Sequence, residues 1–443
     1  MKKTTLVNFF KVKNSEFMKN FNNINNFIMV GMVLILLCSP FLLSAQNEGY
    51  IYGKITTIDD RTYVGPIRWG KEEVFWTDMF NASKERNENL DYLSRNEREE
   101  LEDNYRRNNN NGSYWERRVS NWFSSEWNWN DDRYEFKHQF VCQFGEIKSI
   151  RPYRRNGADI VLRNGDKVEV DGQGYNDIGS KIRILDPEIG EIELPWDRID
   201  MIEFSQAPSK MDETFGEPLY GSVETYGGVF TGFIQWDHDE RVGDDKLDGD
   251  SRDGDVSISF GKIASIENDG NRSEVVLNSG RRFSLRGTND VNNENRGIIV
   301  TTKEFGRVDI PWREFKKVTF TKSKGKLTSY DQFGSAKDLS GAVKVSGGET
   351  LKGRIVFDLD EEKDYEILQG KDNDIEYLIP FRNIKYLSPK SYRNSSIELK
   401  NGTKIVLEDS HDVSDRNSGI LVFSGNGDPT YVRWEDVREI NFN

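Results

Sequence analysis

The chain of 443 residues contains little histidine and cysteine, three His and two Cys. His138, His238 and His411 lie far apart in the sequence, so neither a His-based triad nor a site with several His ligands is expected. Basic residues are also outnumbered, with 61 Lys and Arg against 75 Asp and Glu, which gives a net charge of -14. Because an acidic surface repels phosphate, we expect no nucleic-acid partner.

Long hydrophobic runs are confined to the N-terminus, at residues 27–44. Lys19 precedes this run and a Ser-Ala-Gln sequence ends it, which predicts a signal peptide over residues 1–45. The alternative is an uncleaved membrane anchor, since the run is close to the shortest that spans a bilayer. We expect an exported protein, periplasmic or extracellular, with no stable membrane span after cleavage. Removal of Cys38 would leave Cys142, within a predicted strand, as the single thiol and exclude an intramolecular disulfide.

The hydrophobic fraction is low, at 35%, but 12% of the residues are aromatic. Large rings fill a thin β core efficiently, so disorder throughout the chain is not expected. Many of the 38 Gly residues occur in short sequences such as "NSG", "KNG" and "RNG". These sequences are typical of tight hairpins and indicate an all-β chain.

Three long stretches, residues 51–206, 219–322 and 339–442, begin and end alike. They open with "YGKITTIDDRTYVGPIRW", "YGSVETYGGVFTGFIQWD" and "SGAVKVSGGETLKGRIVFD", and they close with "GEIELPWDRIDMIEF", "GRVDIPWREFKKVTF" and "DPTYVRWEDVREINF". This similarity predicts three tandem repeats. The expected boundaries are 46–206, 219–322 and 339–443, with linkers at 207–218 and 323–338.

A shorter motif occurs six times: an aromatic residue followed at the third and sixth positions by apolar residues. The copies are Phe144/Ile147/Ile150, Trp196/Ile199/Ile202, Phe260/Ile263/Ile266, Trp312/Phe315/Val318, Phe381/Ile384/Leu387 and Trp434/Val437/Ile440. The three-residue spacing is too tight for a strand and fits one turn of 3₁₀ helix. Each long repeat is therefore expected to contain two related units.

Residues 274–320 illustrate one unit. Their alternation predicts two strands joined at a Ser-Gly turn, two further strands, a 3₁₀ turn and a short fifth strand, which describes a small SH3-like barrel. Within that class, "VLNSGRRFSLRGTNDVNNENRGIIV" and "LKNGTKIVLEDSHDVSDRNSGILV" resemble the first half of an Sm-like barrel.

The whole pattern also resembles exported bacterial repeat proteins of uncharacterised function. The resemblance implies an all-β fold of tandem small SH3/Sm-like barrels, six units in three pairs, and it implies no activity. A six-bladed propeller is the alternative, because six all-β units of this size would also fit it.

The first repeat carries an insertion at residues 80–135. Its charged part, residues 84–107, consists of good helix formers with a thin apolar stripe at Leu90, Tyr92, Leu93 and Leu101. A second predicted helix follows and is rich in Trp; the candidate ligand-binding residues are Trp115, Trp122, Trp127 and Trp129. These rings are predicted either to form a partner-binding or sugar-stacking face or to cap an open barrel end.

Two acidic features of the sequence are candidate sites. Asp248, Asp250, Asp253 and Asp255 alternate with Gly in "LDGDSRDGD", as oxygen ligands for calcium would, although the spacing departs from an EF-hand and a solvated hairpin tip is the alternative. The loops containing Asp290 and Asp412 are predicted to be turns in which the carboxylate bonds local backbone N–H groups, or else polar ligand loops.

The chain shows no Ser/His/Asp order, no phosphate-binding Gly-rich loop and no His/Cys metal pattern. We therefore expect a non-catalytic exported binding or structural module that is not an enzyme, with a protein or glycan partner and no cofactor other than calcium at the acidic hairpin. The alternative is a carbohydrate-binding or carbohydrate-active surface-associated protein that uses the aromatic insertion.

Overall fold

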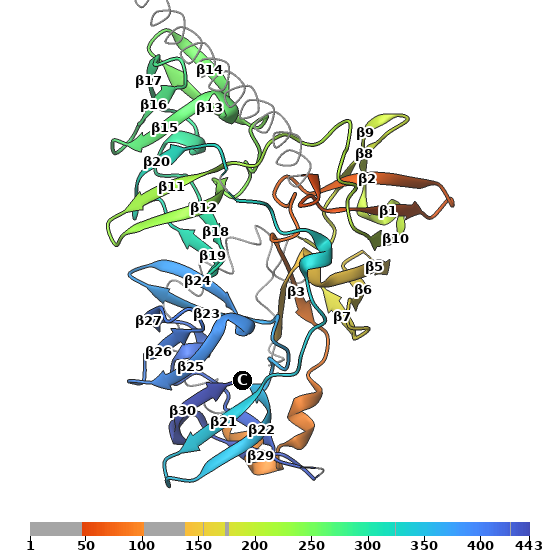
Figure 1. Ribbon diagram of the computed structural model, residues 1–443, viewed down its shortest axis with the longest axis vertical. Helices are drawn as coiled ribbons and strands as arrows, with labels where there is room; N and C mark the ends of the chain where they lie inside the picture. The colour runs from red at the N-terminus through yellow and green to blue at the C-terminus, as the bar shows by residue number, and fades with distance from the viewer. Residues whose placement is uncertain (1–46, 102–137, 154, 173–176, 324, 426) are drawn as a thin grey trace, which may run out of the picture.

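The computed structural model describes residues 47–101, 138–153, 155–172, 177–323, 325–425 and 427–443 (Figure 1). The predicted signal peptide lies outside these residues. Within them the chain is all-β, with antiparallel strands connected by turns and short 3₁₀ helices. None of the helices in the described ranges is long and apolar enough to cross a membrane.

Three segments, matching the three long stretches of similar sequence, each contain ten strands. The first segment comprises β1 (Tyr52–Thr57), β2 (Thr62–Trp69), β3 (Met79–Lys84), β4 (His138–Gln143), β5 (Ile147–Tyr153), β6 (Gly157–Leu162), β7 (Lys167–Asp171), β8 (Ile182–Asp186), β9 (Gly190–Leu194) and β10 (Ile199–Phe204). The second comprises β11 (Tyr220–Thr225), β12 (Val229–Trp236), β13 (Lys246–Ser251), β14 (Gly254–Ser259), β15 (Ile263–Asn268), β16 (Ser273–Leu277), β17 (Arg282–Leu285), β18 (Ile298–Thr302), β19 (Gly306–Ile310) and β20 (Phe315–Phe320). The third comprises β21 (Ser340–Val345), β22 (Thr350–Phe357), β23 (Ile367–Asp372), β24 (Ile375–Pro380), β25 (Ile384–Pro389), β26 (Asn394–Leu399), β27 (Lys404–Glu408), β28 (Ile420–Phe423), β29 (Thr430–Val432) and β30 (Val437–Phe442).

The 3₁₀ turns predicted at the aromatic motif are present in five of its six copies: η2 (Phe144–Glu146), η3 (Trp196–Arg198), η4 (Phe260–Lys262), η7 (Phe381–Asn383) and η9 (Trp434–Asp436). In the sixth copy, residues 312–314 form a turn before β20 begins. Other 3₁₀ helices are η1 (Glu88–Tyr92), η5 (Asn289–Val291), η6 (Tyr330–Gln332) and η8 (His411–Val413). The aromatic residue that starts each copy is buried and belongs to the core.

Strand pairing within each segment is nested. In the first segment, the β1–β2 hairpin pairs with β10 and β8, which come after the inner strands β3–β7. The second and third segments repeat this arrangement, since β11–β12 pair with β20 and β18, and β21–β22 pair with β30 and β28. The hairpin that opens a segment is therefore completed by the strands that end it.

This pairing corrects the expected barrel at residues 274–320. The hairpin β16–β17 pairs with β15, whereas β18 pairs with β12 and β20 pairs with β11 and β15. The five consecutive strands thus do not form one closed unit, because the long opening hairpin takes up their hydrogen-bonding edges. The described strands form large antiparallel sheets and no closed barrel.

The second and third segments lie in one column, with the first segment beside them (Figure 1). Pairing of β19 with β24 joins the second segment to the third. Residues 323–338, expected to be a linker, pack against the first segment: the Tyr330 ring lies 4.5 Å from that of Trp76, and the Tyr330 hydroxyl donates to the Ile147 carbonyl at 2.9 Å. The second and third segments are thus joined by strand pairing, and the residues between them pack on the first segment.

Candidate functional site

One carboxylate in each segment caps the loop between its second and third strands. The three residues accept two backbone N–H groups each: Asp78 from Val74 and Phe75, Asp245 from Arg241 and Val242, and Glu366 from Glu362 and Lys363. Each also pairs with a cation from another segment: Asp78 with Arg241, Asp245 with Arg68, and Glu366 with Lys84. In each of the three segments, the carboxylate at this structural position therefore forms an ion pair with another segment.

The contacts between the first and second segments are reciprocal. Arg241 Nη2 lies 2.8 Å from Asp78 Oδ1, and Arg68 Nη1 lies 2.7 Å from Asp245 Oδ1. The Arg241–Asp78 pair is buried, with side chains only 1% and 5% exposed. Removing one member of such a pair leaves an uncompensated buried charge, which makes this junction sensitive to substitution.

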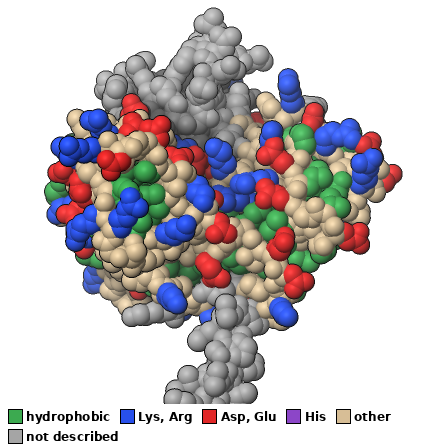
Figure 2. Space-filling view, turned by 90° about the horizontal axis from the view of Figure 1, so that it is seen from above, with side chains coloured by type: hydrophobic (Ala, Val, Ile, Leu, Met, Phe, Trp, Pro, Cys, Tyr) green, Lys and Arg blue, Asp and Glu red, His purple; other side chains and the backbone are tan. Residues whose placement is uncertain are grey.

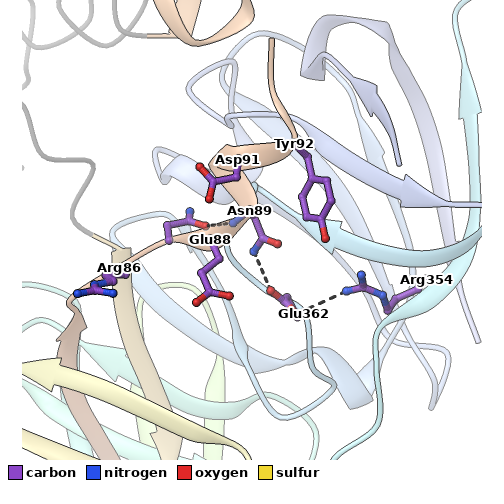
Figure 3. Close-up of a pocket in the computed structure, with 8 residues that line it drawn as sticks. Arg86, Glu88, Asn89, Asp91, Tyr92, Arg354 and Glu362 are labelled. Carbon is purple, nitrogen blue, oxygen red and sulfur yellow. Dashed lines mark hydrogen bonds and ion pairs between the residues drawn. The ribbon is translucent and has the colours of Figure 1, made fainter. Parts of the chain in front are cut away.

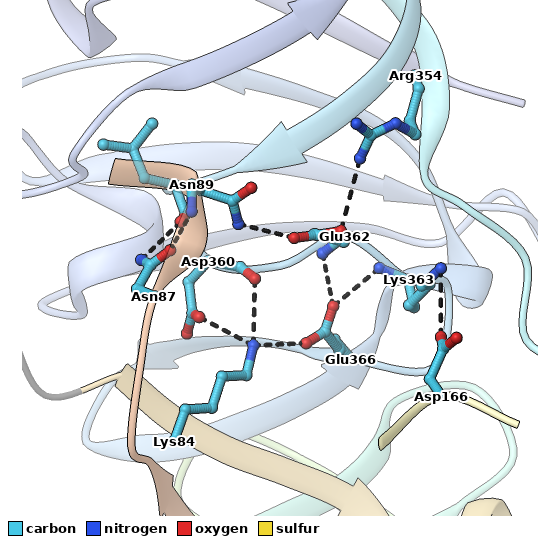
Figure 4. Close-up of polar contacts among 10 residues, drawn as sticks. Lys84, Asn87, Asn89, Asp166, Arg354, Asp360, Glu362, Lys363 and Glu366 are labelled. Carbon is cyan, nitrogen blue, oxygen red and sulfur yellow. Dashed lines mark hydrogen bonds and ion pairs between the residues drawn. The ribbon is translucent and has the colours of Figure 1, made fainter. Parts of the chain in front are cut away.

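Lys84, at the end of β3, anchors the first segment to the third (Figure 4). Its Nζ donates to Asp360 Oδ1 and to Glu366 Oε1, both at 2.8 Å. Burial lowers the pKa of Lys84, but the carboxylates of Asp360 and Glu366 outweigh it and raise the pKa above its ordinary value. Nearby, Lys363 joins Asp166 of the first segment at 3.3 Å. These ion pairs therefore hold the start of the insertion against the third segment.

Apolar contacts support the same junction. Leu93 is 5% exposed and packs in a cluster with Val356, Leu359 and Leu421 of the third segment. Leu90 and Leu101 are partly buried against this cluster. The thin apolar stripe predicted in the insertion is therefore a docking face for the third segment, and residues 95–101 are helical, as expected.

A pocket of about 750 Å³ lies at this junction, between the start of the insertion and the third segment (Figure 3). The third segment contributes Arg354 and Glu362 to its lining, and the insertion contributes Arg86, Asn87, Glu88, Asn89, Asp91 and Tyr92. The Asn89 side chain donates to Glu362 Oε1 at 2.8 Å, which ties the two walls together. The pocket combines guanidinium, carboxylate and amide groups with one half-exposed ring, that of Tyr92.

Local sequence explains how η1 presents these groups. Asn87 caps η1, because its Oδ1 accepts the Asn89 N–H at 2.9 Å. Its Nδ2 donates to the Leu359 carbonyl at 2.9 Å. No local pattern in the sequence predicts this pocket, because its walls are more than 260 residues apart along the chain. The expected apolar stripe at Leu90 and Leu93 was the signal that this region docks.

Of the residues proposed as sites from the sequence, those that the structure describes do not line this pocket. Trp115, Trp122, Trp127 and Trp129 lie outside the described residues. Asp248 and Asp250 are exposed on β13, Asp255 is exposed on β14 opposite Asp250, and Asp253 lies in the turn between these strands. The described structure brings three or more potential metal ligands within 4.8 Å of one another elsewhere, at Asp358, His411 and Asp412.

Asp290 and Asp412 do not cap local turns, in contrast to the prediction. Asp290 accepts the N–H of Asp248 at 2.7 Å, and Asp412 accepts that of Gln369 at 2.6 Å. In the first segment, Asp177 bonds the Asn81 N–H in the same way at 2.6 Å. These aspartates hold the inner hairpin of each segment through contacts more than 40 residues apart, which no local pattern predicts.

A buried or partly buried glutamate accompanies each of these aspartates. The pairs are Glu73 with Asp177, Glu240 with Asp290, and Glu361 with Asp412. In each pair, burial and then the charge of the aspartate raise the pKa of the glutamate, which reaches about 9 in Glu240. Burial likewise raises the pKa of Asp177 and of Asp412 to about 7. Each segment therefore contains acidic groups that are costly to ionise.

Cys142 is a buried free thiol on β4, as the strand prediction indicated. Burial, followed by the charge of Glu146, raises its pKa well above the ordinary value. A thiol in this state is a poor nucleophile.

No family model matches the chain, and no curated protein matches it. A solved structure entitled "Streptogramin B lyase structure" is similar over 68% of this chain and 94% of its own, at 10% identity and a TM-score of 0.13. A similarity this weak carries no argument about the protein.

Proposed function

We propose that the protein is a non-catalytic exported binding module built from three tandem repeats, and that its ligand site is the polar pocket lined by Arg86, Tyr92 and Arg354. In this proposal each repeat is a pair of units related to small SH3/Sm-like barrels, which stay open because the opening hairpin of the repeat pairs with its closing strands. In all three segments the opening hairpin pairs with the closing strands, which supports the repeats, and the 3₁₀ turns support the small-barrel units.

The pocket is the observation that carries this proposal. Its volume of about 750 Å³ lies within the range of small-molecule sites. Its two walls are fixed by the Lys84 ion pairs and by the Leu93 cluster, so a ligand meets a largely preformed surface. Preformed sites lose less conformational entropy on binding.

The chemistry of the lining selects a polar ligand. Arg86 and Arg354 supply charged donors, and Glu88, Asp91 and Glu362 supply acceptors. On the face of the molecule seen in Figure 2, acidic and basic side chains are interspersed, without one extended patch of either sign. We therefore propose that the pocket recognises its ligand by directed hydrogen bonds and not by long-range electrostatic attraction.

A carbohydrate ligand is the second candidate, and Tyr92 favours it. This ring is 47% exposed and lines a pocket otherwise rich in planar polar groups. An exposed aromatic face beside such donors and acceptors suits the apolar face and hydroxyl rim of a sugar.

A glycan array and a peptide array, followed by calorimetry on the hits, test both candidates. We expect a ligand whose affinity falls at least tenfold in Arg86→Ala and in Tyr92→Ala, which alter exposed side chains of the pocket. Tyr226→Ala is the matched control, because its ring is 69% exposed in the second segment. Hits on the glycan array alone would select the carbohydrate. Equal binding by all three variants would contradict the pocket assignment.

A further inference from the structure

Two buried aspartates and one histidine converge in the third segment. Asp358 follows β22 with φ of 52°, and Asp412 lies in η8 next to His411. Asp358 and Asp412 are 6% and 8% exposed, and one ligand atom from each of the three residues lies within 4.8 Å of the others. His411 Nδ1 lies 2.5 Å from Asp358 Oδ2. The topology thus gathers two buried carboxylates and one partly exposed imidazole at one site.

A third acidic group, Glu361, lies near this cluster and has an unsatisfied oxygen. Its Oε2 is inaccessible to solvent and has no hydrogen-bond donor among the described residues. Asp412 is the strongest charge acting on Glu361, and Asp358 also contributes. A buried carboxylate oxygen without a donor is destabilising, and a bound cation would satisfy it.

In the second segment an arginine pairs with one aspartate of the corresponding arrangement, although Glu240 Oε2 there has no donor among the described residues either. Asp237 and Asp290 occupy the positions of Asp358 and Asp412 there. The Arg296 side chain supplies the positive charge: its Nε lies 3.5 Å from Asp237 Oδ1, and its Nη2 lies 2.5 Å from Asp239 Oδ2. The backbone N–H of Arg296 also donates to Asp237 Oδ1, at 2.5 Å.

In the third segment, Ser418 stands where the second segment has Arg296. Its backbone N–H donates to Asp358, as that of Arg296 does to Asp237, but its side chain brings no charge. Among the described residues, no lysine or arginine forms an ion pair with Asp358, Asp412 or Glu361. The third segment therefore keeps both aspartates, pairs Asp358 with His411, and lacks the arginine that pairs with Asp237 in the second segment.

We propose that the third segment binds a divalent first-row metal ion through Asp358, Asp412, Glu361 and His411. Carboxylates favour ions such as Mn²⁺, and an imidazole adds affinity for Zn²⁺, so this mixed set selects that class over calcium. The ion takes the place of the Arg296 guanidinium. This site is distinct from the acidic hairpin of the second segment and independent of the polar pocket.

Calorimetric titration of the purified protein with Zn²⁺ and, separately, with Mn²⁺ tests the site. We expect one ion per chain and a rise in melting temperature of several degrees at saturation. Affinity should fall at least tenfold in Glu361→Gln and in His411→Gln. Glu240→Gln, the same change in the second segment, should leave binding unchanged. Cooperative unfolding of each variant without metal shows that it is folded.

Ser418→Arg is the sharpest variant, because it installs in the third segment the residue that the second segment has. It should abolish metal binding while the melting temperature without metal stays level or rises. Absence of binding by the unaltered protein at millimolar metal would overturn the proposal. So would unchanged binding by Ser418→Arg or by the Glu361→Gln/His411→Gln double variant, since the ions would then be held elsewhere.

Discussion

Ile150 on β5 lies directly opposite Ile202 on β10 in an antiparallel pair, and both side chains are fully buried. Each is the last residue of one copy of the aromatic motif. The other two segments place the corresponding residues opposite each other in the same way, as Ile266 with Val318 and Leu387 with Ile440. The two copies in a segment therefore meet across one strand pair, which explains why the motif occurs in twos.

The nested pairing predicts that half a segment does not fold alone. A fragment of residues 219–288 contains β11–β17 but lacks β18 and β20, the partners of β12 and β11. We expect it to be unfolded by far-UV circular dichroism, whereas residues 219–322 should unfold cooperatively. Cooperative unfolding of the shorter fragment would contradict the pairing of the opening hairpin with the closing strands.

Gly221 should not tolerate a side chain. A Cβ at this position would collide with the backbone carbonyl oxygen of Thr319 on the paired strand β20. We expect Gly221→Ala to lower the free energy of unfolding by about 1–3 kcal/mol in urea denaturation. Gly228→Ala, in the same hairpin, is the control: a Cβ there meets nothing within 4 Å, so the change should be neutral or slightly stabilising. Similar losses in both variants would argue against the close packing of β11 on β20.

Arg241 should be the most sensitive charge between the first and second segments. Arg241→Met leaves the Asp78 carboxylate buried without its guanidinium, and we expect a loss of about 3–5 kcal/mol in the free energy of unfolding. The control is Lys54→Met, which removes an exposed ion pair with Glu203 and should cost at most about 1 kcal/mol. Equal effects would show that the Arg241 pair is solvated in solution.

Glu146 should make the protein less stable at alkaline pH. Its side chain is 3% exposed; burial raises its pKa from 4.5 to about 7, although Arg382, 2.8 Å away, lowers it. A raised pKa in the folded state contributes stability that is complete below pH 4.5 and is lost as the pH rises through 7.

Glu146→Gln cannot ionise, so it should gain stability relative to the unaltered protein between pH 5 and pH 8. We expect a relative gain of about 2–3 kcal/mol, measured by urea denaturation at both pH values. Glu188→Gln, at an exposed turn, should show less than about 0.5 kcal/mol of such change. A difference independent of pH would mean that Glu146 ionises as freely in the fold as in the unfolded chain.

Much of the fold could be predicted from the sequence, and little of the candidate site. The spacing of Phe144, Ile147 and Ile150 correctly indicated a 3₁₀ turn followed by a strand, because that spacing is a local property of the backbone. The role of Asp412 could not be predicted in the same way, since its partner, Gln369, lies 43 residues away. The cluster with His411 and the pocket beside Tyr92 depend on such distant contacts.

The sequence by itself determined the class of structure: alternating apolar residues specify which face of each strand is buried, Gly turns specify hairpins, and the aromatic motif specifies where 3₁₀ turns occur. Only the tertiary structure decided which strands pair, because several similar strands offer the same backbone hydrogen bonds and apolar face. As a result, the hairpin that opens a segment pairs with the strands that end it, as Gly53 on β1 does with Phe204 on β10. It also brought scattered charges such as Lys84 and Asp360, 276 residues apart, into one junction, where burial gives them their chemistry.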